Sequence, residues 1–140
     1  MPFELIYNSI ADLDITEKDI KDILKEAIDF NSKNKITGCL LFHNMEFLQI
    51  LEGEREIILE LYGKLLKDKR HNTVTLINQA EISSVLFSDW SMAFKELSDS
   101  DMLSLKNHIN IKDFHQLINN LDRQTVSKDL FVIISKAILS

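Results

Sequence analysis

Tyr7 and Gln49 are polar side chains in two segments that are otherwise rich in hydrophobic residues. Gln49 interrupts the apolar run of residues 47–53, and a buried amide without a partner would cost about 1–3 kcal/mol. It should therefore have a dedicated partner, either in the protein or on a ligand. Tyr7 shares a strand face with apolar residues, and a phenol and an amide on neighbouring strands lie within hydrogen-bond reach. A structural Tyr–Gln bond and a ligand-linked pair both fit this pattern.

A second group of polar residues lies at the ends of two predicted helices. Asn31 is near the end of the first helix, and Asp68, Arg70 and His71 follow the second. Helix capping and surface solvation are ordinary roles for such residues. However, the two helices should pack on the same sheet face, so a flat ligand between them would contact both groups. The sequence therefore predicts a pocket between the helices.

Hydrophobic periodicity predicts the elements that position these residues. Alternating apolar residues are typical of strands, and apolar residues three and four apart are typical of helices. Thr16 and Asp19 have the spacing of a helix cap. The predicted order is strand 3–8, helix 16–34, strand 37–43, strand 47–53, helix 57–68, strand 74–81 and strand 90–95, then helices 99–107, 113–121 and 127–139.

This order predicts an α+β fold, with a ferredoxin-like βαββαββ arrangement around a mixed five-stranded sheet. Two helices should lie on one face. Because residues 47–51 are apolar on both faces of their strand, a second layer should cover the other face, and the C-terminal helices are the candidates. We interpret residues 1–96 as the ligand-binding domain and residues 97–140 as a helical extension packed on the sheet.

Composition restricts the class of protein and its partners. A chain of 140 residues, of which 45% are hydrophobic, fits one domain with a full core. The net charge of −6 and the lack of a basic block argue against nucleic acid and anionic membranes. Cys39 is the only cysteine, which fits a reducing compartment. No secretory pattern or long apolar run is present, so we expect a cytoplasmic protein.

Five segments share their order and spacing with one known family. They are Leu5-Ile6-Tyr7-Asn8-Ser9, Asn31 with Ile36-Thr37-Gly38, residues 47–53, Asp68-Lys69-Arg70-His71 and Phe87-Ser88-Asp89-Trp90-Ser91-Met92. Together these segments resemble BLUF domains, which are blue-light sensors that use flavin. The resemblance covers about residues 3–96. Two positions depart from the family pattern: Phe30 replaces a residue that is often polar, and Val85 replaces a frequent arginine.

The resemblance implies that a flavin binds between the two helices, with FAD favoured and FMN or riboflavin as alternatives. The implied binding residues are Ile23, Asn31, Gln49, Leu65, Asp68, Arg70 and His71. The two aliphatic residues would contact the ring faces, Asn31 would bond the carbonyl and imide edge, and the last three would line the entrance and the ring edge. Lys64 is a weaker candidate for the polar tail of the flavin.

The resemblance also implies a photoactive switch and not an enzyme. Tyr7 would donate an electron and a proton to light-excited flavin and then recover both. The Gln49 amide would rotate or tautomerise, which exchanges donor and acceptor positions without moving charge. Trp90 and Met92 would relay this change through the fifth strand to the C-terminal helices. A downstream protein or a second copy of the chain would receive the signal there.

Other functions have weaker support in the sequence. A ferredoxin-like hydrolase of small anions would need a Gly-rich anion loop, and none is visible. The four histidines lack a metal-ligand spacing such as i, i+4 on one helix. A light-insensitive interaction module would keep the same fold, and the absence of flavin colour would identify it.

Overall fold

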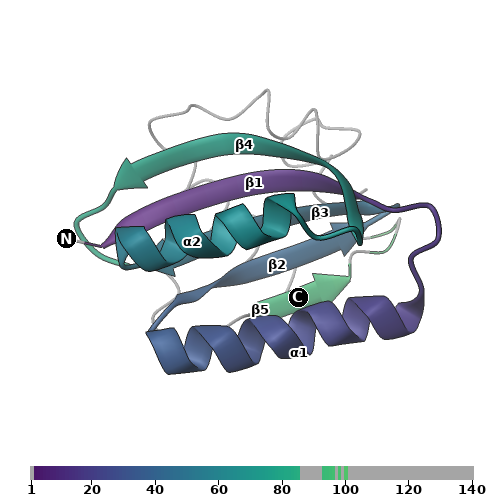
Figure 1. The fold of residues 1–140 in the computed structure, drawn as a ribbon, viewed down its shortest axis with the longest axis horizontal. Helices are drawn as coiled ribbons and strands as arrows, with labels where there is room; N and C mark the ends of the chain where they lie inside the picture. The colour runs from purple at the N-terminus through teal and green to yellow at the C-terminus, as the bar shows by residue number, and fades with distance from the viewer. Residues whose placement is uncertain (1, 86–92, 97, 99, 101–140) are drawn as a thin grey trace.

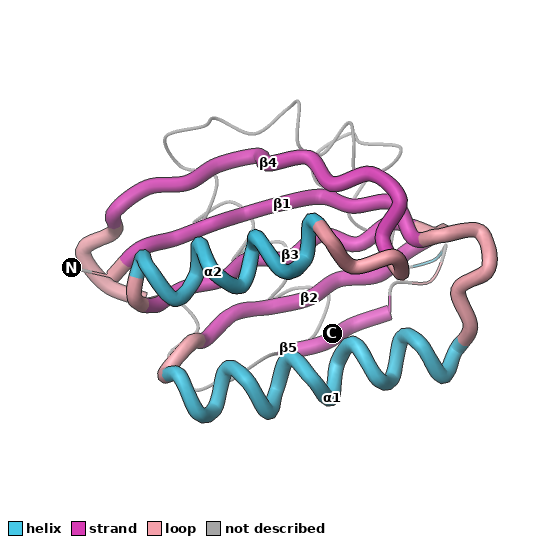
Figure 2. Tube along the Cα trace, viewed as in Figure 1, coloured by secondary structure: helices cyan, strands magenta, loops and turns pink. Residues whose placement is uncertain are grey.

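The computed structural model describes residues 2–85, 93–96, 98 and 100 (Figure 1). In chain order the elements are β1 (Phe3–Ala11), α1 (Glu17–Asn34), β2 (Thr37–His43), β3 (Glu46–Gly53), α2 (Arg55–Leu66), β4 (His71–Glu81) and β5 (Ala93–Glu96). Figure 2 shows both helices on the same side of the sheet. The predicted α+β fold, with two helices on one sheet face, is therefore confirmed.

The strands form one sheet in the order β4-β1-β3-β2-β5. β1 pairs antiparallel with β3 and β4, and β2 pairs antiparallel with β3. The segment β5 pairs parallel with β2. The register of β1 against β3 places Tyr7 opposite Gln49. The neighbouring positions of β1 and β3, which the ferredoxin-like order requires, thus bring the two polar side chains together.

A tight hairpin and a close strand contact fix the position of β2 against β3. Asn44 and Met45 connect the strands with φ angles of 47° and 68°. Positive φ at both central residues gives a turn whose twist matches that of the flanking strands. At Gly38, an added Cβ would overlap the backbone carbonyl oxygen of Ile50. Glycine is therefore needed there because the β3 backbone approaches closely.

The helix ends follow from local hydrogen bonds. At the start of α1, Asp19 N–H donates to the Thr16 hydroxyl oxygen over 3.1 Å, and Thr16 N–H donates to the Asp19 carboxylate over 3.0 Å. This capping box confirms the predicted start. α2 ends at Leu66, slightly before the predicted end near Asp68. The two N–H groups that follow α2 donate to carbonyl oxygens three residues earlier, Lys67 to Lys64 and Asp68 to Leu65. These bonds tighten the final turn.

The hydrophobic core lies between the helices and the sheet. Phe47 and Leu51 of β3 belong to it and are fully buried. On the opposite face of the sheet Ile6, Leu48 and Ile50 are also buried, each at most 1% exposed. Both faces of β3 are therefore shielded from solvent, as its apolar composition predicts.

Two differences from the sequence interpretation concern the second half of the chain. β4 begins at His71, three residues before the predicted Val74, because His71 already pairs with Ala11 of β1. Backbone pairing there does not require an apolar pattern. Trp90, Met92 and the predicted helices 99–107, 113–121 and 127–139 lie outside the described residues. Within the described part of the chain, neither helix is long and apolar enough to span a membrane.

Candidate functional site

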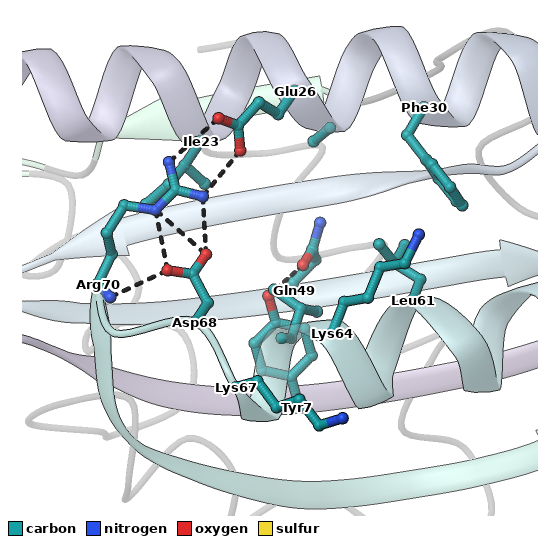
Figure 3. Close-up of a pocket in the computed structure, with 12 residues that line it drawn as sticks. Tyr7, Ile23, Glu26, Phe30, Gln49, Leu61, Lys64, Lys67, Asp68 and Arg70 are labelled. Atoms are coloured by element: carbon teal, nitrogen blue, oxygen red, sulfur yellow. Dashed lines mark hydrogen bonds and ion pairs between the residues drawn. The ribbon is translucent and has the colours of Figure 1, made fainter.

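A cavity of about 390 Å³ lies between α1 and α2 above the centre of the sheet (Figure 3). It is lined by Tyr7, Ile23, Glu26, Ala27, Phe30, Gln49, Leu61, Lys64, Leu65, Lys67, Asp68 and Arg70. Its volume is in the range of small-molecule sites, and its combination of apolar walls with a few polar groups is typical of them. The predicted pocket between the helices is therefore present.

Tyr7 and Gln49 come from the sheet side of this cavity. The Tyr7 hydroxyl donates a hydrogen bond to Oε1 of Gln49. The two side chains are 1% and 4% exposed, respectively. Burial, followed by the nearby Asp68 carboxylate, raises the pKa of Tyr7 above its ordinary value. The phenol therefore keeps its proton and acts as a donor, which directs the Gln49 carbonyl oxygen toward Tyr7.

Aliphatic side chains of the two helices form the cavity walls. Ile23 comes from α1 and Leu65 from α2, so both residues that the sequence assigned to the ring faces line the cavity. Ile23 is buried in the core cluster, and Leu65 packs against that cluster. Each belongs to a helical stripe, since the lining residues of α1 lie three, four and seven positions after Ile23, and Leu61 and Leu65 of α2 are four apart. These stripes face one another across the cavity.

Asp68, Arg70 and Glu26 form a charged cluster at one end of the cavity (Figure 3). The Arg70 Nη2 group donates to Asp68 Oδ2 over 2.7 Å and to Glu26 Oε2 over 2.7 Å. Burial raises the pKa of Asp68, but hydrogen bonds from Arg70 outweigh this effect and hold it below its usual range. Hydrogen bonds to Asp68 and then to Glu26 raise the pKa of Arg70. Asp68 and Arg70 are therefore charged at neutral pH.

Asn31 and His71 are buried near the cavity but are not among its lining residues. The backbone carbonyl oxygen of Asn31 accepts a hydrogen bond from Ile36 N–H over 3.0 Å at the end of α1. His71 Nδ1 lies 2.8 Å from the Ser9 hydroxyl, and its ring contacts Phe47 edge-on at 5.1 Å between centroids. Among the described residues, His71 Nε2 has no hydrogen-bond partner. Burial lowers the pKa of His71.

Several lining residues were not assigned to the site by the sequence. Glu26 and Lys67 are among them, and helical spacing from Ile23 could have identified Glu26. Lys64, proposed for the polar tail, lines the cavity, and its Nζ lies 5.2 Å from the centre of the Phe30 ring. Phe30 thus contributes a hydrophobic surface at a position where the family often has a polar residue. Trp90 and Met92 lie outside the described residues.

Comparisons with known proteins agree with this geometry. The family described as sensors of blue-light using FAD, BLUF, matches residues 3–93. Photoactivated adenylate cyclase subunit beta of Euglena gracilis is 33% identical over 89 residues, which cover 63% of this chain and 10% of that protein. The blue light- and temperature-regulated antirepressor BluF of Escherichia coli (strain K12) is 36% identical over 74 residues, covering 52% and 18%. The solved ground state of BlsA has a TM-score of 0.78 and 30% identity, covering 93% and 85%.

The fold and the family match place this chain among the domains described as sensors of blue light using FAD. The chain belongs to the BLUF family. It spans about a tenth of the length of the cyclase subunit that it matches. The flavin site fits the residues present, because the cavity between α1 and α2 combines aliphatic walls with the polar pair on the sheet.

Proposed function

We propose that Tyr7 and Gln49 are the photoactive switch of this sensor. The observation that carries this proposal is the buried hydrogen bond from the Tyr7 hydroxyl to Gln49 Oε1, because both residues also line the cavity. A buried neutral amide has a donor end and an acceptor end, so it can connect the phenol to a ligand. Asp or Glu at position 49 would add charge, and Leu would lose both ends.

The remaining site residues have distinct proposed roles. Ile23 and Leu65 hold the flat ring between the helices, in agreement with their positions on opposite walls of the cavity. Asp68 and Arg70 provide a polar edge at one end. Asn31 and His71 complete this polar environment, although their side chains are not part of the cavity lining. FAD is the flavin that we favour, with FMN and riboflavin as alternatives.

A bound flavin supplies a chromophore that becomes a strong electron acceptor when it absorbs blue light. Tyr7 would supply an electron from its ring and its hydroxyl proton to that acceptor and would then take both back, so no net oxidation would remain. During this cycle the Gln49 amide rotates or tautomerises. The donor and acceptor ends of the amide would exchange positions. Tyr7 and the edge of the flavin ring would each then face the other end of the Gln49 amide. The stored signal is thus a changed hydrogen-bond pattern.

A light-minus-dark absorption spectrum of the reconstituted protein tests this assignment. We expect a reversible red shift of the oxidised flavin bands, because a stronger hydrogen bond to the ring carbonyl lowers the transition energy. The shift should be lost in Gln49→Leu and in Tyr7→Phe. Tyr62→Phe is a matched control. Tyr62 belongs to α2, its ring centroid lies 6.0 Å from that of Tyr7, and it is outside the proposed switch. A bleached or unchanged wild-type spectrum would exclude the switch.

We further propose that residues 97–140 are helical, cover the second face of the five-stranded sheet, and receive the signal through Trp90 and Met92. The burial of Ile6, Leu48 and Ile50 on that face supports a cover. Rearranging one or two hydrogen bonds supplies about 1–3 kcal/mol, whereas a near-complete population shift needs about 5.5 kcal/mol. The relay must therefore act on an element that is already close to balance. Identical hydrogen exchange over residues 90–140 in light and darkness would exclude it.

The output of this sensor is proposed to be a protein contact in the cytoplasm. The Escherichia coli relative is named an antirepressor and the Euglena relative a cyclase subunit, so both relatives couple a domain of this kind to another activity. We propose that the chain acts on a downstream protein or on a second copy of itself through residues 97–140. Light-dependent size-exclusion chromatography would test self-association, and an unchanged elution volume would leave a separate protein as the receiver.

A further inference from the structure

An ion pair between Glu26 and Arg70 joins α1 to the segment that follows α2. Arg70 Nη2 lies 2.7 Å from Glu26 Oε2, and Arg70 Nη1 lies 3.4 Å from Glu26 Oε1. Both carboxylate oxygens therefore contact the guanidinium, in the paired geometry that suits arginine. The two residues are 44 positions apart in the sequence. The contact thus connects two elements that enclose the cavity from different sides.

Arg70 is also held from its own side of the cavity. Its Nε donates to Asp68 Oδ1 over 3.0 Å, and its backbone N–H donates to the same oxygen over 3.0 Å. Asp68 therefore holds the base of the side chain and one side of the guanidinium, and Glu26 holds the other side of the guanidinium. Figure 3 shows the guanidinium lying between these two carboxylates, with α1 on one side and the segment leading into β4 on the other. All three residues line the cavity.

We propose that Glu26 is a positioning residue that holds Arg70 across this end of the cavity and so controls the rate of flavin exchange. This inference rests on the proposed flavin site. A ligand that passes between α1 and the segment after α2 must separate Glu26 from Arg70. The Glu26–Arg70 ion pair is taken to be intact both in the empty and in the flavin-bound protein. Removing it therefore lowers the free-energy barrier to flavin entry and to flavin release by the same amount. Association and dissociation should then accelerate together, while the equilibrium affinity stays the same.

The exposure of the pair sets the size of the effect. The Arg70 side chain is 27% exposed and that of Glu26 is 63% exposed. Partly exposed ion pairs are weak and are screened by salt. We therefore expect an increase of about two- to five-fold in both rate constants for Glu26→Gln. Glu26→Lys should give a larger increase because it repels Arg70, and Glu26→Asp should restore much of the wild-type behaviour.

Riboflavin is the probe for this experiment because it carries no phosphate charge. Equilibrium titration of riboflavin into the wild-type protein comes first, followed by stopped-flow fluorescence of association and of displacement. Asp29→Asn is the matched control, since it removes one exposed carboxylate from the same helix and Asp29 is not among the cavity-lining residues. The proposal expects wild-type rates for Asp29→Asn, and for the wild type it expects faster exchange at high salt.

Each outcome has a definite meaning. Parallel increases in both rate constants for Glu26→Gln, with the dissociation constant unchanged within about two-fold, support the inference. Riboflavin binding with rates equal to those of the wild type would overturn the positioning role and leave the flavin site intact. A change in dissociation alone would also overturn it, because Glu26 would then act on bound-state affinity. Failure of the wild-type protein to bind either riboflavin or FAD would overturn the flavin site itself.

Discussion

A double-mutant cycle on Tyr7 and Gln49 measures the strength of the hydrogen bond at the centre of the site. Tyr7→Phe keeps the buried ring but removes the donor to Gln49 Oε1. The free energy of unfolding of the flavin-free protein should fall by about 1–3 kcal/mol, because a buried acceptor loses its partner. Gln49→Leu leaves the Tyr7 hydroxyl buried without this acceptor, so a loss of similar size is expected.

The double variant should be less destabilised than the sum of the two single variants. With both groups replaced by apolar ones of similar shape, neither polar atom is left without a partner. The two changes affect neighbouring residues, with Tyr7 and Gln49 directly paired across β1 and β3. We therefore expect a coupling energy of about 1–2 kcal/mol, within the range for contacting residues.

Urea unfolding followed by circular dichroism provides the assay, with equal m-values required for all variants. Tyr62→Phe is the control, and it should change the unfolding free energy by less than about 0.5 kcal/mol because Tyr62 is only partly buried. Single-variant losses that add within about 0.5 kcal/mol would refute the reasoning, since the hydroxyl and the amide would then be energetically independent.

Other predictions concern the sheet and one buried histidine. Gly38→Ala should destabilise the protein by about 1–3 kcal/mol in urea unfolding, because its Cβ would overlap the Ile50 carbonyl oxygen. Gly63→Ala on α2 should instead stabilise the protein by about 0.5–1 kcal/mol, because the added Cβ meets no atom within 4 Å. A fall in the free energy of unfolding of this variant would contradict the open space around Gly63. Burial lowers the pKa of His71 below its ordinary value of 6.5. The contribution of neutral His71 to the free energy of unfolding should be complete above pH 6.5. It should decline as the pH falls toward the folded-state pKa, because the unfolded chain binds the proton at a higher pH than the folded protein does. The unfolding free energy of the wild type minus that of His71→Gln should therefore decrease from about pH 7 to about pH 5, and a constant difference would refute this assignment.

Much of the fold could be predicted because local patterns and the buried layer agree. Alternation in residues 3–8 and helical spacing after Thr16 predict the first two elements, and the structure places them there. The pairing of Tyr7 with Gln49 was also predictable, since a buried amide needs a polar partner and the predicted order of strands places Tyr7 on the neighbouring strand. The start of β4 at His71 was missed because an edge strand pairs through its backbone and does not require apolar side chains.

The charged end of the cavity was harder to predict from the sequence. The Glu26–Arg70 contact depends on the conformations of two long side chains, and helical spacing only shows that Glu26 shares a face with Ile23. His71 stays a predicted ring-edge residue; in the structure its ring contacts Phe47 and its Nδ1 lies 2.8 Å from the Ser9 hydroxyl. Sequence proximity to Arg70 did not determine this orientation, because Arg70 lies in the turn before β4 and His71 is the first residue of the strand.

Infrared difference spectroscopy of the flavin-loaded protein with isotope-labelled glutamine tests the switch most directly. The central claim is that blue light rearranges the Gln49 amide that bonds Tyr7 in the dark. We predict a light-minus-dark band of the labelled amide carbonyl, because its hydrogen-bond partner changes. This band should be lost in Gln49→Leu, while the other glutamines remain. A wild-type difference spectrum without any glutamine band, recorded while the flavin absorption shifts, would contradict the claim.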